Sequence, residues 1–383
     1  DLLNFERHYQ SLPSCEEVNQ ELIDAILGEA SKFAEEVVAP LNAVGDEVGC
    51  ERRKNGDVTT PPGFKEAYQQ YIDGGWPSLD QPARWGGQDL PMSIGLPIRE
   101  MNGTANWSWA MYSGLSQGAM ETIDEHGSDE QKAIFMEPLV SGRWTGTMCL
   151  TEAHCGTDLG LIKTKAEQAA DGTYRITGSK VFISSGDHDL AENIVHIVLA
   201  RLPDSPPGTK GISLFIVPKF LPADDGSIGA RNDVGCGALE RKMGSHGNST
   251  CVMDFDGATG YLVGEENKGL RYMFTFMNFA RLGTGLQGLA HAELSFQNSL
   301  AYARDRLQMR SLSGPRNPAG PADPIIVHPD VRRMLLTQKA FAEGGRALVY
   351  FASTQGDILT KSEDPEAREL ANHVLNFLTP IIK

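Results

Sequence analysis

Two short segments of this chain place hydroxyl, glycine and aromatic residues at the ends of predicted strands. The first, Met148 to Asp158, reads MCLTEAHCGTD, and the second, Lys180 to Gly186, reads KVFISSG. A strand that breaks into a glycine-containing loop exposes backbone N–H groups and hydroxyls, which can bind a pyrophosphate or the polar edge of a heteroaromatic ring. A simpler interpretation is that Thr151 and Glu152 end a strand and that Phe182 belongs to the core.

Two other patterns resemble chemical sites but favour packing. Residues 283–288 read GTGLQG and match GxGxxG, yet they lie inside a predicted helix and do not follow a strand. Glycines cost stability inside a helix, so we expect them to allow close helix packing. His154 lies beside Cys155 with Cys149 nearby, but these spacings do not match a known zinc set, and we predict no metal site.

The elements that position these segments predict an α+β fold, with helices first, then strands, then long helices. Apolar residues recur at helical spacing over 16–39, and Pro40 ends that pattern. After Gly142, short β-branched and aromatic runs separated by turn residues indicate a mostly antiparallel β unit. The helical period returns from Gly269. We expect three domains, namely an N-terminal all-helical domain at 1–143, a central antiparallel β-barrel-like domain at 144–265, and a partial C-terminal helical bundle at 266–383.

Two residues mark where helices begin. Ser128 can cap a helix that runs to Gly142. Pro365 stands at an early helical position of a last helix that starts near Asp364. No βαβ repeat is visible, which disfavours the phosphate-binding architecture of nicotinamide enzymes.

Composition argues against some partners and locations. The chain has 34 Lys and Arg against 50 Asp and Glu, a net charge of −16 that repels nucleic acid and anionic lipid. The six cysteines form no CxxC pair, so we expect reduced thiols. No apolar run reaches the length of a membrane span and no secretory signal is visible, which predicts a cytoplasmic protein.

The ordered motifs resemble the FAD-dependent acyl-CoA dehydrogenase family. The first segment is similar to the family motif TEPxAGSD, and the second is similar to WI[TS][NS]G. Four residues stand where the family usually has Pro, Ala, Ser and Trp, namely Ala153, Cys155, Thr157 and Phe182. Segments 242–250 and 262–270 add to the resemblance. The GSHGN sequence and the long loop 311–329 are most similar to the longer-subunit branch that includes 3-methylmercaptopropionyl-CoA dehydrogenase.

The resemblance implies a flavin site and names its residues. The first family motif holds the FAD pyrophosphate and pyrimidine edge, a role that carries over to Met148, Leu150, Thr151, Gly156 and Thr157. The second motif implies that Phe182 flanks the isoalloxazine ring and that Ser184 bonds near its hydride-accepting nitrogen. Residues 302–309 resemble a stretch that crosses a dimer interface, so Arg306 would meet the pyrophosphate of the partner subunit's FAD. Arg281 would contact the substrate.

The same resemblance implies α,β-dehydrogenation of an acyl-CoA thioester to the trans-2-enoyl-CoA, as in fatty acid β-oxidation. It also implies electron-transferring flavoprotein as the acceptor and a homodimer or tetramer as the assembly. Two other hypotheses stay open. One is an acyl-CoA oxidase or flavin monooxygenase-like member of the same fold, and the other is a non-catalytic acyl-CoA-binding subunit.

No catalytic base is named in this chain. The family's QxxGGxG segment and its catalytic Glu segment do not occur before Lys383, and Ala280 stands where some members place the base. The catalytic Glu is therefore expected C-terminal to Lys383. A start at Asp1 and an apolar run over 379–383 lead us to expect that the sequence is part of a longer protein.

Overall fold

A computed structural model describes residues 3–223 and 227–383. The chain divides into two compact units, the first formed by Asp1–Lys32, Pro91–Ala105 and Arg281–Lys383, and the second by Phe33–Leu90 and Asn106–Ala280. Two long helices, α5 (Met92–His126) and α7 (Gly269–Asp305), contribute to both units. The predicted order of helices, strands and helices is confirmed. The division at residues 143 and 265 stays a prediction.

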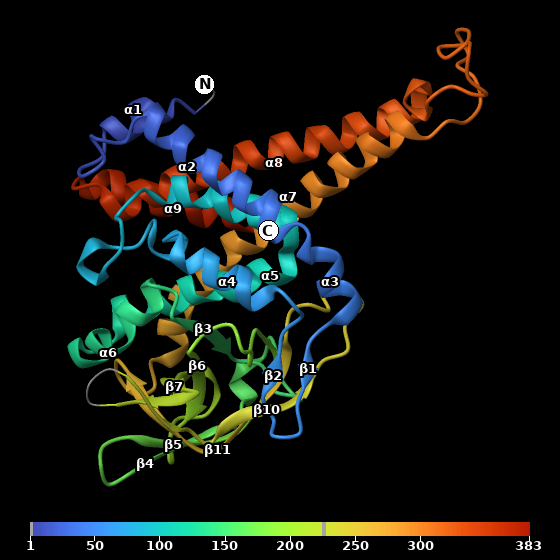
Figure 1. Cartoon of the computed structure of the whole chain (residues 1–383). Coiled ribbons are helices and arrows are strands. Elements are labelled where there is room, and N and C mark those ends of the chain that lie inside the picture. The colour runs from blue at the N-terminus through green and yellow to red at the C-terminus, as the bar shows by residue number, and fades with distance from the viewer. Residues whose placement is uncertain (1–2, 224–226) are drawn as a thin grey trace. The chain divides into compact units, whose positions relative to one another are not determined.

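A seven-stranded sheet lies at the centre of the second unit (Figure 1). Its strands are β3 (Trp144–Cys149), β4 (Lys165–Gln168), β5 (Tyr174–Ser184), β6 (Asn193–Arg201), β7 (Ile212–Pro218), β10 (Val234–Leu239) and β11 (Thr250–Val263). Two small hairpins accompany it, formed by β1 (Glu51–Arg52) with β2 (Val58–Thr59) and by β8 (Phe220–Pro222) with β9 (Ile228–Arg231).

The expectation of an antiparallel β-barrel-like domain is corrected in the direction of its strands and in the closure of its sheet. Most neighbouring strands are antiparallel, but β6 runs parallel to both β3 and β4, so the sheet is mixed. Strand β4 meets β6 at the single pair Lys165–Arg201, and the described strands form no closed barrel. Parallel pairing needs a long connection, which the chain between β3 and β6 supplies.

Both faces of this sheet are covered, which explains the uninterrupted apolar sequence of β6 and β7. Val195, Ile197 and Leu199 of β6 join one cluster, and the intervening Val198 and Ala200 join another. Successive side chains of a strand point to opposite faces, so a strand buried on both faces is apolar throughout. The first cluster includes residues of α6 (Asp129–Val140), and the second includes residues of β5, β10 and β11.

Several helical segments of the second unit precede the sheet in the chain. They are a π-helical turn (Ala34–Val38), α3 (Leu41–Val48) and α4 (Phe64–Asp73), together with short 3-10 turns at Trp76–Ser78 and Ala83–Trp85. Two further 3-10 turns, Leu159–Leu161 and Gly208–Gly211, connect strands. The predicted Ser128 cap is confirmed, because Ser128 and Gln131 form a reciprocal capping box at the start of α6.

The first unit consists of helices. They are α1 (Phe5–Gln10), α2 (Gln20–Phe33), α8 (Pro329–Lys361) and α9 (Pro365–Ile382), with the first part of α5 and the later part of α7. Helices α7 and α8 lie side by side and are joined by residues 306–328, which include the short turn Ile325–Val327 (Figure 1). Helix α9 begins at Pro365, as predicted, and Asp364 caps it by accepting from the Glu366 N–H.

The glycines of the GxGxxG segment lie inside α7, which confirms that the segment does not follow a strand. A Cβ at Gly285 would collide with Cγ2 of Ile382 in α9, so these helices approach closely at this residue. Gly283 and Gly288 would meet nothing within 4 Å. The packing explanation therefore holds for Gly285 and does not extend to the other two glycines.

A partly buried ionic network joins α8 to α5 and α7 in the first unit. The Arg346 guanidinium donates to Glu100 Oε1 at 2.7 Å and to Glu293 Oε2 at 2.7 Å. The Tyr350 hydroxyl donates to the second oxygen of Glu100 at 2.6 Å. Burial opposes the charge on Arg346, but these two carboxylates raise its pKa above the ordinary value.

No helix in the described part of the chain combines the length and apolar character that a bilayer span requires.

Candidate functional site

The two motif segments lie directly against each other in the second unit. The Val181 N–H donates to the Thr151 carbonyl at 2.9 Å, and the Lys180 ammonium donates to the Leu150 carbonyl at 2.9 Å. Thr151 comes just after β3, and Val181 lies near the end of β5. These two bonds fix the ends of the strands relative to each other, so the exposed groups of both segments share one surface.

A buried ion pair beneath this surface anchors the loop after β3. Glu152 Oε1 accepts from Lys180 Nζ at 2.9 Å, and the two side chains are 5% and 0% exposed. The same carboxylate accepts from the N–H of Lys163 at 2.7 Å and from both the N–H and the hydroxyl of Thr164, at 3.0 and 2.7 Å. Glu152 therefore connects the first motif to the second motif and to the chain that leads into β4.

The electrostatics of this pair are consistent with an ionised carboxylate. Burial raises the pKa of Glu152, but Lys180 and the bonds from Thr164 and Lys163 lower it, and the net pKa lies below the ordinary value. Burial is the main cause that lowers the pKa of Lys180, and Glu152 opposes that shift. Because every oxygen of Glu152 is occupied by donors, we assign it a structural role and no role as a proton acceptor.

The loop after Glu152 presents donors that no group in residues 3–223 and 227–383 accepts from. Glu152 and Cys155 exchange backbone hydrogen bonds of 2.9 and 3.0 Å, which closes a tight turn. Beyond it, Gly156 and Thr157 are exposed, and within the described residues their amides and the hydroxyls of Thr151 and Thr157 bond to no other protein group. A Cβ at Gly156 would touch only Thr151 Cγ2, at 3.6 Å. This surface is open to a ligand rich in acceptor oxygens.

Phe182 is an exposed aromatic ring at the end of β5. It is 64% exposed, and its φ of 59° lies in the left-handed region, which is costly for a residue with a side chain. The pairing of β5 with β11 shifts register between Cys251 and Met253, beside this residue. A bulge re-aims a side chain, and here it turns an apolar ring toward solvent.

The other residues named from the motifs occupy less exposed positions. Ser184 is half-buried and pairs with Thr250 of β11. Leu150 belongs to the core and Met148 packs against it. These two can contribute to a ligand site mainly through their backbone, because their side chains face the protein interior.

Arg281 and Arg306 belong to the first unit, whereas the two motif segments belong to the second. Arg281 is half-buried within α7, and Arg306 is exposed just after that helix. The Arg306 carbonyl accepts from the Ile325 N–H at 2.8 Å. The loop between Arg306 and Ile325 is organised by Asp323, whose carboxylate accepts from the N–H groups of Ser311 and Asn317. These bonds lower the pKa of Asp323 to about 2.

Three potential metal ligands meet near the first motif. One ligand atom from each of Glu152, His154 and Cys155 lies within 4.8 Å of the others. Glu152 is already saturated by donors, and the His154 Nε2 bonds to the Leu161 carbonyl at 2.9 Å. The coordination needs of an ion would compete with these contacts, so the group carries no metal assignment.

Comparison with known proteins identifies the family. Models of the N-terminal, middle and C-terminal domains of acyl-CoA dehydrogenases match residues 20–143, 147–258 and 267–371. The chain belongs to the acyl-CoA dehydrogenase family. The middle-domain match includes both motif segments, and the resemblance found from those motifs is confirmed.

Individual acyl-CoA dehydrogenases are similar along most of this chain. It is 46% identical to 3-methylmercaptopropionyl-CoA dehydrogenase of Ruegeria pomeroyi, covering 98% of this chain and 63% of that protein. It is 38% identical to a butyryl-CoA dehydrogenase of Syntrophomonas wolfei, covering 94% and 60%. The solved butyryl-CoA dehydrogenase of Megasphaera elsdenii has the same fold, with a TM-score of 0.74, 23% identity and coverage of 95% and 85%. The chain thus spans less than two thirds of those curated relatives.

The sequence did not predict the residues that support the GSHGN segment, which in turn contacts the second motif. The Tyr112 hydroxyl donates to the Gly247 carbonyl at 3.1 Å and accepts from the Ser249 N–H at 2.9 Å. Asn248 donates to the Ser185 hydroxyl at 3.0 Å. The GSHGN sequence was the available signal, but a single sequence does not show that α5 would supply the tyrosine.

Proposed function

We propose that the protein is an FAD-dependent acyl-CoA dehydrogenase that converts an acyl-CoA thioester to the trans-2-enoyl-CoA. The names of the relatives support this activity, since both curated relatives described above are acyl-CoA dehydrogenases. The structural observation that carries the proposal is the exposed ring of Phe182 beside a loop of unpaired amides and hydroxyls. An apolar ring next to such donors suits a flat heteroaromatic group with an attached pyrophosphate.

The residues at the strand ends fit FAD. The amides of Gly156 and Thr157 and the hydroxyls of Thr151 and Thr157 would donate to pyrophosphate oxygens or to the pyrimidine edge. The backbones of Met148 and Leu150 would line the same edge, with Phe182 flanking the ring and Ser184 hydrogen-bonding to it. When bound, FAD would supply the acceptor for a hydride from the substrate β-carbon.

The residues beneath these groups fix their positions. Glu152 and Lys180 keep the strand ends in register, so donors are aligned before the ligand arrives, and little ordering cost remains at binding. The Phe182 ring would exclude water from one face of the flavin. Arg281 is proposed to contact the substrate. The base that removes the α-proton is assigned to no residue of this chain.

Flavin binding is tested by reconstituting the purified protein with FAD and measuring retained flavin after gel filtration. Phe182→Ala should weaken retention, because a stacking surface worth about 1 kcal/mol, or roughly fivefold in Kd, is lost. Phe182→Trp, which restores the residue usual in the family, is the matched control and should retain FAD. Equal retention by the wild type and Phe182→Ala would remove Phe182 from the site.

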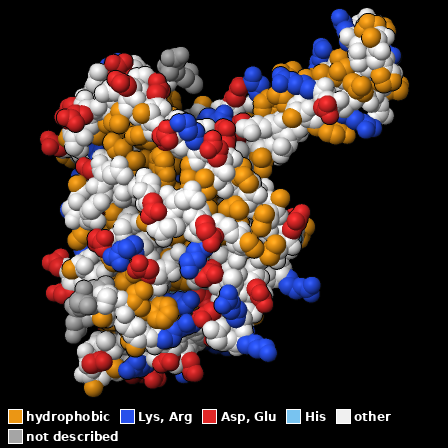
Figure 2. Space-filling model, viewed as in Figure 1, with side chains coloured by type: hydrophobic (Ala, Val, Ile, Leu, Met, Phe, Trp, Pro, Cys, Tyr) orange, Lys and Arg blue, Asp and Glu red, His pale blue; other side chains and the backbone are white. Residues whose placement is uncertain are grey.

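Assembly as a homodimer or tetramer is proposed from the surface of the first unit. Exposed apolar side chains lie on the end of α7, the start of α8 and the loop between them. Figure 2 shows them as orange patches on the part of the first unit that these segments form. They are Tyr302, Leu307, Met309, Leu312, Leu336 and Phe341. A second copy would cover this surface and bring Arg306 to the partner's FAD. Arg306→Ala should then reduce FAD retention, and unchanged retention would reject that role.

Electron-transferring flavoprotein is the proposed electron acceptor. If the enzyme is a dehydrogenase, aerobic turnover with an artificial acceptor should produce little hydrogen peroxide. Stoichiometric peroxide would instead indicate an oxidase. Butyryl-CoA and 3-methylmercaptopropionyl-CoA are suitable first substrates because the relatives carry these names. A cytoplasmic location stays a prediction.

A further inference from the structure

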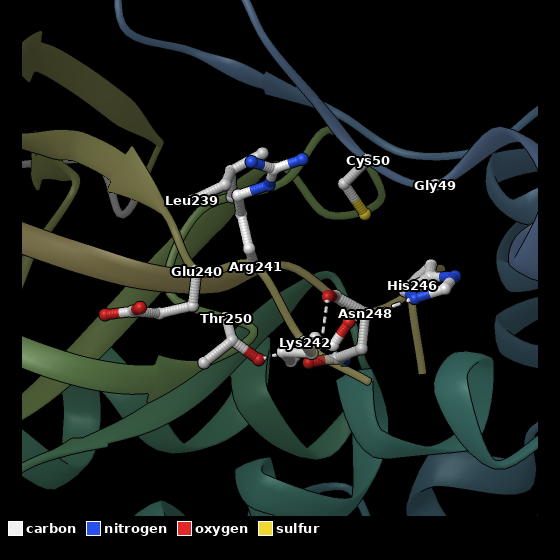
Figure 3. Close-up of a pocket in the computed structure, with 9 residues that line it drawn as sticks. All are labelled: Gly49, Cys50, Leu239, Glu240, Arg241, Lys242, His246, Asn248 and Thr250. Atoms are coloured by element: carbon white, nitrogen blue, oxygen red, sulfur yellow. Dashed lines mark hydrogen bonds between the residues drawn. The ribbon is translucent and has the colours of Figure 1, made fainter. Parts of the chain in front are cut away.

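A cationic cavity lies in the second unit, at the GSHGN segment that the proposed flavin site does not use (Figure 3). Its volume is about 300 Å³. The wall is formed by the turn after α3, the end of β10, the connecting segment 240–248 and the start of β11. It includes Cys50, Leu239, Glu240, Arg241, Lys242, His246 and Thr250. A volume of this size is at the lower end of small-molecule sites.

Lys242 is a half-buried cation in this cavity. Its ammonium donates to the Asn248 carbonyl at 2.7 Å and to the Thr250 hydroxyl at 2.9 Å, as Figure 3 shows. No carboxylate in the described residues forms an ion pair with it, and burial lowers its pKa. An ammonium has three donors, so one N–H remains for a ligand. An unneutralised, partly buried charge is costly unless an anion accompanies it.

Arg241 adds a second positive charge. Its side chain is exposed, and over residues 3–223 and 227–383 its guanidinium has no hydrogen-bond or ion-pair partner. The neighbouring Glu240 side chain points away from it in Figure 3. His246 is different, because its ring contacts the Asp46 carboxylate at 3.0 Å. Glu240 also lines the cavity, but within the described residues no ion pair joins it to Arg241 or Lys242, and the two cations exceed this one carboxylate.

We propose that this cavity binds the phosphate group of a small phosphorylated ligand. A guanidinium fork binds phosphate oxygens in pairs and an ammonium binds them as a point charge. Local cations are needed here, because the net charge of −16 repels anions elsewhere. Leu239 and Cys50 give the cavity an apolar side that suits the organic remainder of such a ligand.

A purely structural role explains only part of this arrangement. Lys242 holds the chain at Asn248 and Thr250, and this contact would stabilise the segment without any ligand. That role does not explain Arg241, whose side chain forms no hydrogen bond or ion pair within the described chain. Arg241 is therefore the informative position, and Arg241→Gln breaks no bond within the described chain.

The test is isothermal titration calorimetry of the FAD-saturated protein with inorganic phosphate and with ADP. Saturating the protein with FAD keeps ADP from the proposed flavin site. We expect saturable binding of at least one probe, weakened about tenfold or more by Arg241→Gln, which is the effect of losing one hydrogen bond between charged groups. The control is Lys165→Gln, which removes the same charge from an exposed position on β4 and should leave Kd unchanged.

Several results would overturn the proposal. They are no saturable binding of either probe at millimolar concentration, equal binding by the wild type and Arg241→Gln, or equal weakening by Arg241→Gln and Lys165→Gln. The inference does not rest on the proposed function. A protein that cannot be loaded with FAD can be titrated with inorganic phosphate alone, so failure of the flavin proposal is distinguished from failure of this one.

Discussion

Removing Lys180 tests whether the buried ion pair holds the two strand ends together. Lys180→Met keeps the length and apolar stem of the side chain but leaves the Glu152 carboxylate, 5% exposed, without its cation. Breaking one side of a buried pair costs about 3–5 kcal/mol. Three donors from Lys163 and Thr164 would remain on Glu152, so we expect about 3 kcal/mol, at the lower end.

The assay is equilibrium urea unfolding followed by far-UV circular dichroism. Lys163→Met is the matched control, because only the backbone of Lys163 bonds to Glu152, and it should change stability by less than about 0.5 kcal/mol. The double variant Glu152→Gln with Lys180→Met should recover most of the loss, since no unpaired charge stays buried. A loss below about 1 kcal/mol in Lys180→Met would refute the reasoning, given the burial of the pair.

The same pair predicts a pH dependence. The folded-state pKa of Glu152 is depressed, so its contribution is present above the ordinary Glu value of about 4.3 and is lost as the pH falls through the lower folded value. The stability difference between wild type and Lys180→Met should therefore be largest near neutral pH and shrink on acidification. A difference that stays constant between about pH 7 and pH 3 would contradict an ionised Glu152.

Two further predictions concern the first unit. Gly283→Ala should stabilise α7 by up to about 1 kcal/mol, because the added Cβ meets open space. Gly285→Ala should destabilise α7, because the added Cβ collides with Ile382. Urea unfolding of the two variants measures this difference, and equal effects would refute the close helix contact. Glu100→Gln should cost about 2–4 kcal/mol, since it removes the charged acceptor of Arg346, and a change under about 0.5 kcal/mol would show that the network contributes little.

Local patterns in the sequence were sufficient to predict the helices and most strands. Ser128 was recognised as a cap and Pro365 as an early helical residue, because helix starts depend on residues within one turn. Helical spacing predicted the segment before Pro40, although the structure resolves it into α2 and a π-helical turn. These features depend on neighbours in the chain, which a single sequence displays.

Features that depend on distant contacts were not predictable in the same way. The direction of β6 relative to β3 depends on how the intervening 43 residues return to the sheet, and both are apolar strands whichever way they run. The bulge of β5 beside Phe182 is set by the pairing of this strand with β11, which is distant in the chain.

The candidate site shows the same division. Thr151, Gly156 and Phe182 could be named because their motifs resemble a known family, but the roles of Glu152 and Lys180 could not, because the pair forms across 28 residues of sequence. A charged residue beside a strand end is more often solvated than buried. Only the contacts around the Glu152 carboxylate reveal that Glu152 organises the loop.

The most direct test of the central claim is anaerobic reduction of bound flavin by acyl-CoA. The purified protein should bind FAD, and adding butyryl-CoA or 3-methylmercaptopropionyl-CoA without oxygen should bleach the visible flavin absorption and yield the corresponding 2-enoyl-CoA. A protein that remains colourless after incubation with excess FAD would contradict the assignment of the strand ends to a flavin.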